Sequence, residues 1–294
     1  MDNSKDIGFQ AADNPLPQLS QRTNYVLLIG IAVWIWLIVQ NISCKPGTDP
    51  PTTTTESGKT TIKTTPDGFT TFSFDYSLVS VDSGRYMMGS PETEKDRIDN
   101  ECQHEVSVNR FHIGKYEVTK TQWRAVARLD PNIAENPSFH KGCNDCPVEQ
   151  ISWNYVQLWI KKLNALTGKN YRLPTEKEWE WAARGGKQGV TDGFIYSGSN
   201  NLGEVGNKGS ETKLVGKGRK ANQLGIFDMS GNIWEWCADM WEDYPDCAAS
   251  KCSDCPVLRG GSWININFNC RVAFRLSSRS NYKDNCTGFR LAQD

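Results

Sequence analysis

Apolar side chains recur at helical spacing in the middle of the chain. Between Ser152 and Gly168, four apolar residues are three or four positions apart: Val156, Trp159, Leu163 and Leu166. That spacing places them on one face of a helix. Serine is a residue type that caps helix starts, and glycine commonly ends helices. The pattern therefore predicts an amphipathic helix between Ser152 and Gly168.

Two further helix starts are predicted by capping boxes, in which the first and fourth residues bond each other's backbone N–H. The ranges 119–122 (TKTQ) and 175–178 (TEKE) both have this spacing. Pro131 is expected to stop the first of these helices, and the Gly-Gly pair at 185–186 the second.

Short apolar runs predict strands at 85–90 (RYMMGS) and 106–116 (VSVNRFHIGKY). From position 185 onward, glycine and asparagine turns dominate and regular structure should become sparse. These patterns together predict an α+β domain with few helices and much ordered loop.

The longest apolar run lies near the N-terminus. Residues 26–39 are wholly apolar, and no charge follows Arg22 until Lys45. The run is short for a membrane-spanning helix, which needs about 20 residues, and suits a signal-peptide core. A buried helix is the alternative that involves no export. Cys44, which follows the run, is a candidate for lipidation, and an uncleaved signal anchor is the rival to that interpretation.

These features divide the chain into four parts. Residues 1–23 form a polar leader, 24–44 a signal, lipoprotein or membrane-anchor segment, 45–68 a linker rich in Thr and Pro, and 69–294 the folded domain. The linker contains almost nothing to bury and is predicted to be flexible. We therefore expect a domain outside the cytoplasm, attached to a membrane of the cell envelope.

Charge and composition narrow the range of partners. A formal net charge of −1 gives no electrostatic reason to expect a nucleic acid. The expected partner is instead a protein or another surface ligand. Eleven tryptophans suit a loop-rich domain that is held by large aromatic anchors.

Seven motifs carry a resemblance to a known family, and they occur in this order: GRYMMGSPETEKDR, HEVSVNRFHIGKYEVTKTQW, CPVEQISW, YRLPTEKEWEWAARGG, LGIFDMSGNIWEWCAD, LRGGSW and GFRLA. Together they resemble the formylglycine-generating-enzyme (sulfatase-modifying factor) family over nearly all of 73–292. The resemblance implies a C-type lectin-like fold of the formylglycine-generating-enzyme type.

The resemblance also implies a test for enzymatic activity. The enzyme of this family oxidises a substrate cysteine with copper held by two thiolates, which suit Cu(I). Counted from the shared GGS, those thiolates would fall at Asn265 and Cys270. Asparagine cannot replace a thiolate, so copper is unlikely to bind there and the chain is expected to lack the oxidase activity. An exported metal-dependent oxidase that uses Cys270 is the alternative.

Calcium is the second metal that the resemblance implies, as a structural ion. In the loop DMSGNIWE, the ligands would be the carboxylates of Asp228 and Glu235 and the carbonyls of Gly231 and Ile233. A second site would use Asn201 and the carbonyl of Leu202. The alternative is that Asp228 and Glu235 only brace the turn before Trp236.

The chain has ten cysteines, and their spacing does not decide between metal ligands, disulfides and free thiols. Cys143 with Cys146, and Cys252 with Cys255, have the CxxC spacing of zinc ligands, and Cys247 is near the second pair. In an exported chain, disulfides that close two independent loops compete with the zinc interpretation. Free thiols are the third possibility.

The C-terminal segment resembles, in its fixed motifs LRGGSW, CRVA and GFRLA, the variable proteins of diversity-generating retroelements, which include a treponemal one. In those proteins template asparagine codons are mutated at adenines, which cannot yield Lys, Gln, Glu, Met or Trp. Among the candidate positions of segment 264–287, Lys283 alone is of an excluded type. The positions predicted to contact a ligand are Ile264, Asn265, Ile266, Phe268, Asn269, Phe274, Leu276, Ser277, Ser278, Arg279, Tyr282, Asp284, Asn285, Cys286 and Thr287.

These observations predict an envelope-tethered, non-catalytic binding protein whose C-terminal surface is diversified. Exposed apolar and polar side chains in one segment are typical of a recognition site. The alternative is that every second residue of this segment packs inward. A structural lipoprotein would be indicated if Ile264, Phe268, Phe274 and Leu276 were all buried.

Overall fold

The computed structural model describes residues 61–64, 70–207, 209–247 and 250–294. The chain divides into two units, Met1–Pro51 and Thr52–Asp294, and every described residue lies in the second. The leader, the apolar segment with Cys44 and most of the linker lie outside the described residues, so their roles stay predictions. Within the described part of the chain, no helix combines the length and the apolar character needed to cross a bilayer.

The three predicted helices are confirmed. They are α2 (Lys120–Ala127), α3 (Trp153–Thr167) and α4 (Glu176–Ala183). Both capping boxes form, and the Ser152 side chain accepts a hydrogen bond from the Tyr155 backbone. Gly168 ends α3 with a φ of 67°, a left-handed conformation that glycine adopts without strain. Two short helices, α5 (Gly186–Gly189) and α6 (Leu202–Val205), follow.

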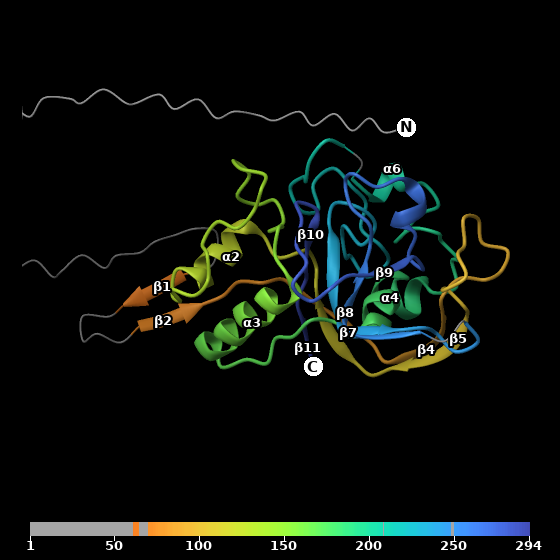
Figure 1. Ribbon diagram of the computed structural model, residues 1–294, viewed down its shortest axis with the longest axis horizontal. Coiled ribbons are helices and arrows are strands. Elements are labelled where there is room, and N and C mark those ends of the chain that lie inside the picture. Colours follow the sequence, from red (N-terminus) through yellow and green to blue (C-terminus); the bar gives the residue numbers. More distant parts are fainter. Residues whose placement is uncertain (1–60, 65–69, 208, 248–249) are drawn as a thin grey trace, which may run out of the picture. The chain divides into compact units, whose positions relative to one another are not determined.

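The strands form four small sheets (Figure 1). The largest has the order β10-β7-β8-β9, and a second has the order β11-β6-β3. The pairs β4-β5 and β1-β2 make the other two. The bounds are β1 (Thr61–Thr64), β2 (Thr70–Ser73), β3 (Leu78–Val81), β4 (Gly84–Met88), β5 (His104–Val108), β6 (Phe111–Gly114), β7 (Trp234–Glu242), β8 (Lys251–Arg259), β9 (Arg275–Ser277), β10 (Thr287–Gly288) and β11 (Ala292–Gln293).

Both faces of the β7–β8 pair are buried over residues 234–237 and 256–259. Successive side chains of a strand point to opposite faces, so Trp236 joins one core cluster and Cys237 the other. Leu258 and Val257 divide in the same way on β8. The first cluster reaches α2 and α3 and the second reaches α4, so the helices lie on the two sides of this pair (Figure 1).

Tryptophans fill the first cluster. The rings of Trp123 on α2 and Trp159 on α3 stack with centroids 5.4 Å apart. Phe289, near the C-terminus, meets both of these rings edge-on. Aromatic pairs of this kind contribute about 0.5–1.5 kcal/mol beyond the area that they bury. The end of the chain is thus packed into the centre of the domain.

Short strands hold the C-terminal segment at three points. β9 pairs with β8, β10 pairs in parallel with β7, and β11 pairs with β6. Two irregular stretches lie between these strands, at 260–274 and 278–286. The first of them contains the 3-10 helix η2 (Asn267–Cys270).

Candidate functional site

Four buried arginines anchor the segment that carries the candidate contact residues. Each is at most 2% exposed, and each pairs with a glutamate from elsewhere in the chain. A buried charge without a partner costs several kcal/mol, so these pairs must form for the segment to fold. We call this set the arginine framework: Arg259, Arg271, Arg275 and Arg290.

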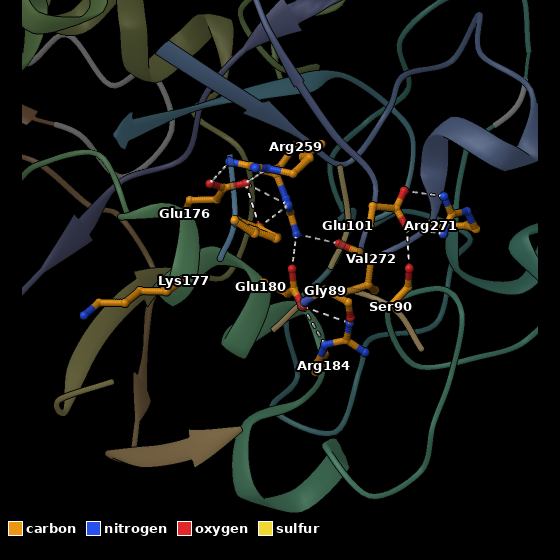
Figure 2. Close-up of polar contacts among 12 residues, drawn as sticks. Gly89, Ser90, Glu101, Glu176, Lys177, Glu180, Arg184, Arg259, Arg271 and Val272 are labelled. Carbon is orange, nitrogen blue, oxygen red and sulfur yellow. Dashed lines mark hydrogen bonds and ion pairs between the residues drawn. The ribbon is translucent and has the colours of Figure 1, made fainter. Parts of the chain in front are cut away.

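Helix α4 supplies two of the glutamates, and Figure 2 shows Arg259 between them. Arg259 donates to Glu176 at 2.9 Å and to Glu180 at 2.5 Å. Arg275 binds Glu176 through two nitrogens, at 2.9 and 2.8 Å. Glu176 and Glu180 are four residues apart and therefore lie on the same face of α4. The helix thereby links the end of β8 to the start of β9.

The other two arginines tie more distant parts of the chain. Arg271 donates two hydrogen bonds to Glu101, at 2.8 and 2.5 Å, and one to Glu94 at 2.7 Å. Arg290 donates to both carboxylate oxygens of Glu235, each at 2.6 Å. Arg259 and Arg275 flank the stretch 260–274, so buried ion pairs hold it at both ends and, through Arg271, from within.

The arginines around Glu180 lower the pKa of its carboxyl group. Burial opposes ionisation, but the guanidinium groups of Arg184 and Arg259 outweigh it and hold the pKa of the carboxyl below its usual value. The backbone N–H of Gly89 also donates to this carboxylate at 2.9 Å. Glu180 is therefore ionised at neutral pH although it is fully buried.

The loop 228–235 does not fit a calcium site in this arrangement. Glu235 is fully buried, and its oxygens accept from Arg290 and from the Trp179 indole at 2.7 Å. Asp228 accepts from Arg219 and from the Gly216 backbone. Each carboxylate already has a cationic partner, and a calcium ion would need to displace it. These contacts fit the alternative interpretation, in which both carboxylates brace the loop.

The remaining predicted calcium ligands are also engaged locally or buried. Gly231 and Ile233 are buried in the same loop. Asn201 caps α6 by accepting from the Gly203 N–H, and the Leu202 carbonyl accepts from Gly206 at 2.7 Å. Within the described residues, no group of three or more His, Cys, Asp or Glu side chains could hold a metal. Calcium binding stays a prediction.

Five of the predicted contact residues are exposed. Ile264 and Ile266 are 63% and 65% exposed, and Leu276 and Tyr282 are each 42% exposed. Large apolar side chains seldom expose this much surface without a binding role when they cluster. We call these residues the exposed C-terminal set: Ile264, Ile266, Leu276, Arg279 and Tyr282.

One hydrogen bond connects the two irregular stretches, which carry four members of the exposed C-terminal set, while Leu276 lies in β9 between them. The Trp263 indole in the first stretch donates to the Asn285 carbonyl in the second, at 3.5 Å. Trp263 is itself buried. The two irregular stretches thus meet at one buried tryptophan.

Three predicted contact residues are buried, and for them the prediction is wrong. Phe274 is 6% exposed because its ring packs on Trp234 and Phe268, with centroids 5.9 and 4.8 Å away. Cys286 is 8% exposed and belongs to the first core cluster, and Thr287 lies in β10 beside β7. The inward-packing alternative therefore holds for part of the segment.

The other predicted contact residues are half-buried: Asn265, Phe268, Asn269, Ser277, Ser278, Asp284 and Asn285. The Asn265 side chain accepts from the backbone and hydroxyl of Ser262. The Phe268 ring lies 5.5 Å from the Arg271 guanidinium. Asp284 accepts from the Tyr282 hydroxyl at 2.7 Å, and this bond raises the pKa of Tyr282 to about 12.

The copper-ligand positions offer one thiol. Cys270 is fully buried in a small cluster with Tyr196, Leu202 and Val205. Asn265 stands at the other position, and its side-chain oxygen is bonded to Ser262. An amide cannot provide the second soft anionic ligand that Cu(I) needs. The residues at these positions do not fit a two-thiolate copper site.

Six cysteines form disulfides. Cys143 bonds Cys146 and Cys252 bonds Cys255, so the two CxxC motifs are separate loop closures. Of the three interpretations left open for these motifs, the structure has the disulfides. A third disulfide, which the spacing did not predict, joins Cys102 to Cys247.

The fold and the anchored C-terminal segment define the class of protein. The chain belongs to the sulfatase-modifying factor family, since the model of the "Sulfatase-modifying factor enzyme 1-like domain" matches residues 70–294. "Chaperone protein LppX" of Paenibacillus barcinonensis is 31% identical over 263 residues, which cover 70% of this chain and 85% of that protein. "Inactive C-alpha-formylglycine-generating enzyme 2" of Bos taurus is 31% identical over 191 residues, which cover 60% of this chain and 57% of the bovine protein.

Solved structures confirm the predicted α+β fold of the formylglycine-generating-enzyme type. "Treponema denticola variable protein 1" has a TM-score of 0.64 at 25% identity, covering 83% of this chain and 99% of that one. PvdO from Pseudomonas aeruginosa has a TM-score of 0.65 at 23% identity, covering 84% of this chain and 100% of that one, and shows the fold alone. The resemblance to a treponemal variable protein is thereby confirmed.

Proposed function

We propose that this protein is an envelope-tethered receptor or adhesin-like protein that binds a ligand through the exposed C-terminal set. The observation that carries the proposal is the contrast within one segment. Arg271, Phe274 and Arg275 are buried, whereas five other side chains of the segment, three of them aliphatic, are exposed. A rigid frame under variable side chains is what a diversified binding surface requires. The likeness to a treponemal variable protein supports the same assignment.

Diversification predicts that the exposed C-terminal set contributes little to folding. We expect single changes to serine at Ile264, Ile266 or Leu276 to alter the free energy of unfolding by no more than about 0.5 kcal/mol. Phe274→Leu is the matched control from the same segment, and it should cost about 1 kcal/mol because Phe274 is packed. Urea denaturation measures both. A loss of more than 1 kcal/mol at the exposed positions would show that they are structural.

A display experiment tests the binding function directly. One library of the full chain randomises the exposed C-terminal set. A second, of equal size, randomises five exposed residues of and after β4 and β5: Arg85, Met87, Glu105, Ser107 and Asn109. Selection against a panel of purified proteins should enrich binders from the first library. Equal enrichment from both libraries would contradict the assignment of the binding surface.

The encoding genome offers an independent test of diversification. A near-duplicate of the codons for 264–287, with AAC at the exposed positions and a reverse transcriptase gene beside it, is the expected finding. If the codons for 264–287 occur only once in the genome, the proposed binding surface is invariant rather than diversified.

The binding proposal and the oxidase alternative predict opposite results in an activity assay. The full chain, incubated with Cu(I) and a sulfatase-type peptide that contains cysteine, should yield no aldehyde because position 265 lacks a thiolate. Mass spectrometry of the peptide measures the product. Formation of aldehyde at a rate that depends on Cys270 would replace the binding proposal with an enzymatic one.

A further inference from the structure

A cavity of about 230 Å³ lies between α2 and the loop that precedes Cys146. Its apolar lining includes Trp123, Pro137 and Val148, and its basic lining consists of Lys120, Arg124 and Lys141. None of these residues belongs to the exposed C-terminal set. A cavity of this size accommodates a small organic group rather than a whole ligand.

The basic lining is only partly neutralised. Lys120 is 7% exposed, and its ammonium lies 3.6 Å from the Glu149 carboxylate. Arg124 donates to the side-chain oxygens of Asn136 and Asn144, and Lys141 donates to the Ser138 carbonyl. Among the described residues, neither Arg124 nor Lys141 forms an ion pair with a carboxylate.

Glu135, the carboxylate in the cavity lining, does not neutralise Arg124 or Lys141. Glu135 pairs with Arg128 at 2.9 Å. Glu149 already accepts from the backbone N–H groups of Phe139 and His140, at 2.9 and 3.1 Å. Two cations therefore line the cavity without an anionic partner among the described residues, in a chain whose formal net charge is −1.

His140 provides a second, independent observation. It lines the same cavity, and its Nε2 atom is buried with no hydrogen-bond partner among the described residues. Buried polar atoms are normally bonded, so an atom of this kind points to a missing partner. An oxygen of a bound anion could accept from Nε2 in the tautomer that carries the proton there.

The cavity adjoins the segment that carries the exposed C-terminal set. The His140 ring meets the Trp263 ring edge-on, with centroids 5.2 Å apart. Pro137 also lines a second cavity, of about 500 Å³, whose lining includes Asn281 and Lys283. The loop from Pro137 to His140 thus separates the basic cavity from the C-terminal segment.

We infer that the basic cavity binds a carboxylate on a short apolar stem, supplied by an acidic side chain or a chain terminus of the protein ligand. Arg124 and Lys141 supply charge-assisted hydrogen bonds, and Trp123 and Val148 contact the stem. Only the claim that the carboxylate belongs to a protein ligand rests on the proposed function. The cavity would then be a constant anchor point beside a variable surface.

Phenylacetate is the probe that tests this site, with the full chain and isothermal titration calorimetry at low salt. We expect millimolar binding that weakens about tenfold or more in Arg124→Gln/Lys141→Gln. Lys187→Gln, which changes an exposed lysine of α5, is the matched control and should bind like the unchanged chain. Phenylacetamide, which lacks the charge, should not bind.

Several outcomes would overturn the assignment. They are no heat with phenylacetate, equal affinity in the double variant with an unchanged melting temperature, or tighter binding of inorganic phosphate. Ile266→Ser should leave phenylacetate binding intact. A failed display selection with intact phenylacetate binding would therefore refute the proposed function, while the reverse result would refute the carboxylate site alone.

Discussion

Glu180→Gln is expected to lower the free energy of unfolding by about 3–5 kcal/mol, because it removes one partner of a buried ion pair and leaves Arg259 with one carboxylate in place of two. Arg259 is fully buried and cannot be rehydrated without opening the core. The glutamine is nearly isosteric, so packing is preserved and the change reports the charge. Chemical denaturation of the two proteins at pH 7 gives the difference.

The control for this prediction is an exposed pair. Asp82 and Arg110 lie 3.0 Å apart with side chains 49% and 70% exposed. Asp82→Asn should leave the stability nearly unchanged, since exposed ion pairs contribute little. If the two substitutions cost the same, the buried pairs are not what holds the C-terminal segment.

The same carboxylate makes stability depend on pH. Because the folded state holds the pKa of Glu180 below its usual value of 4.5, its contribution is fully present above that pH. It is lost as the pH falls through the folded-state pKa. Glu180→Gln should therefore flatten the dependence of stability on pH in this acid range.

Removal of the Cys102–Cys247 disulfide is the second large effect that we expect. The bond joins residues 145 positions apart, and loop-closure entropy gives about 5 kcal/mol for a loop of that length. The double variant Cys102→Ala/Cys247→Ala should therefore lose about 2–5 kcal/mol, measured by urea denaturation under oxidising conditions. The disulfide holds the loop after β4 against the β7–β8 hairpin, so its loss frees both.

Cys252→Ala/Cys255→Ala provides the matched control. This pair is also a disulfide, but its partners are three positions apart, so it constrains the unfolded chain far less. The expected cost is smaller by about 3 kcal/mol. Equal costs would mean that the long disulfide acts through local strain or packing rather than through the unfolded state.

The sequence was sufficient to predict the elements whose signals are local. The capping boxes at 119–122 and 175–178 and the apolar period from Val156 to Leu166 all lie within single helices, and these helices formed as expected. The small strands β9 to β11 could not be located in this way. Two or three residues carry no periodicity, and their partners lie in distant parts of the chain.

The arginine framework was missed because its signal is not local. Arg259, Arg271 and Arg290 lie in motifs that the resemblance picked out, and Arg275 lies two positions after one of them, yet an arginine in sequence is normally exposed. Their partners, such as Glu94 and Glu176, are between 55 and 177 positions away. The signal that could have found them is the recurrence of arginine within fixed motifs on both sides of an irregular segment.

The failure at Phe274 and Cys286 has a similar cause. Composition alone cannot tell an exposed phenylalanine from one that packs on Trp234. Ile264 and Ile266 have the same chemical character as Phe274 and yet are exposed. The deciding factor is where the buried arginines hold the backbone, which is a property of the whole fold.

The position of β10 and β11 after the exposed segment has a consequence for any altered copy of the gene. A premature stop or a shifted reading frame upstream of residue 287 would remove Phe289 from the tryptophan core and Arg290 from Glu235. Such a chain could not complete its folding and would be degraded. Only copies translated through these last residues would complete the core, so the terminus makes folding of the domain depend on an intact reading frame through the segment before it.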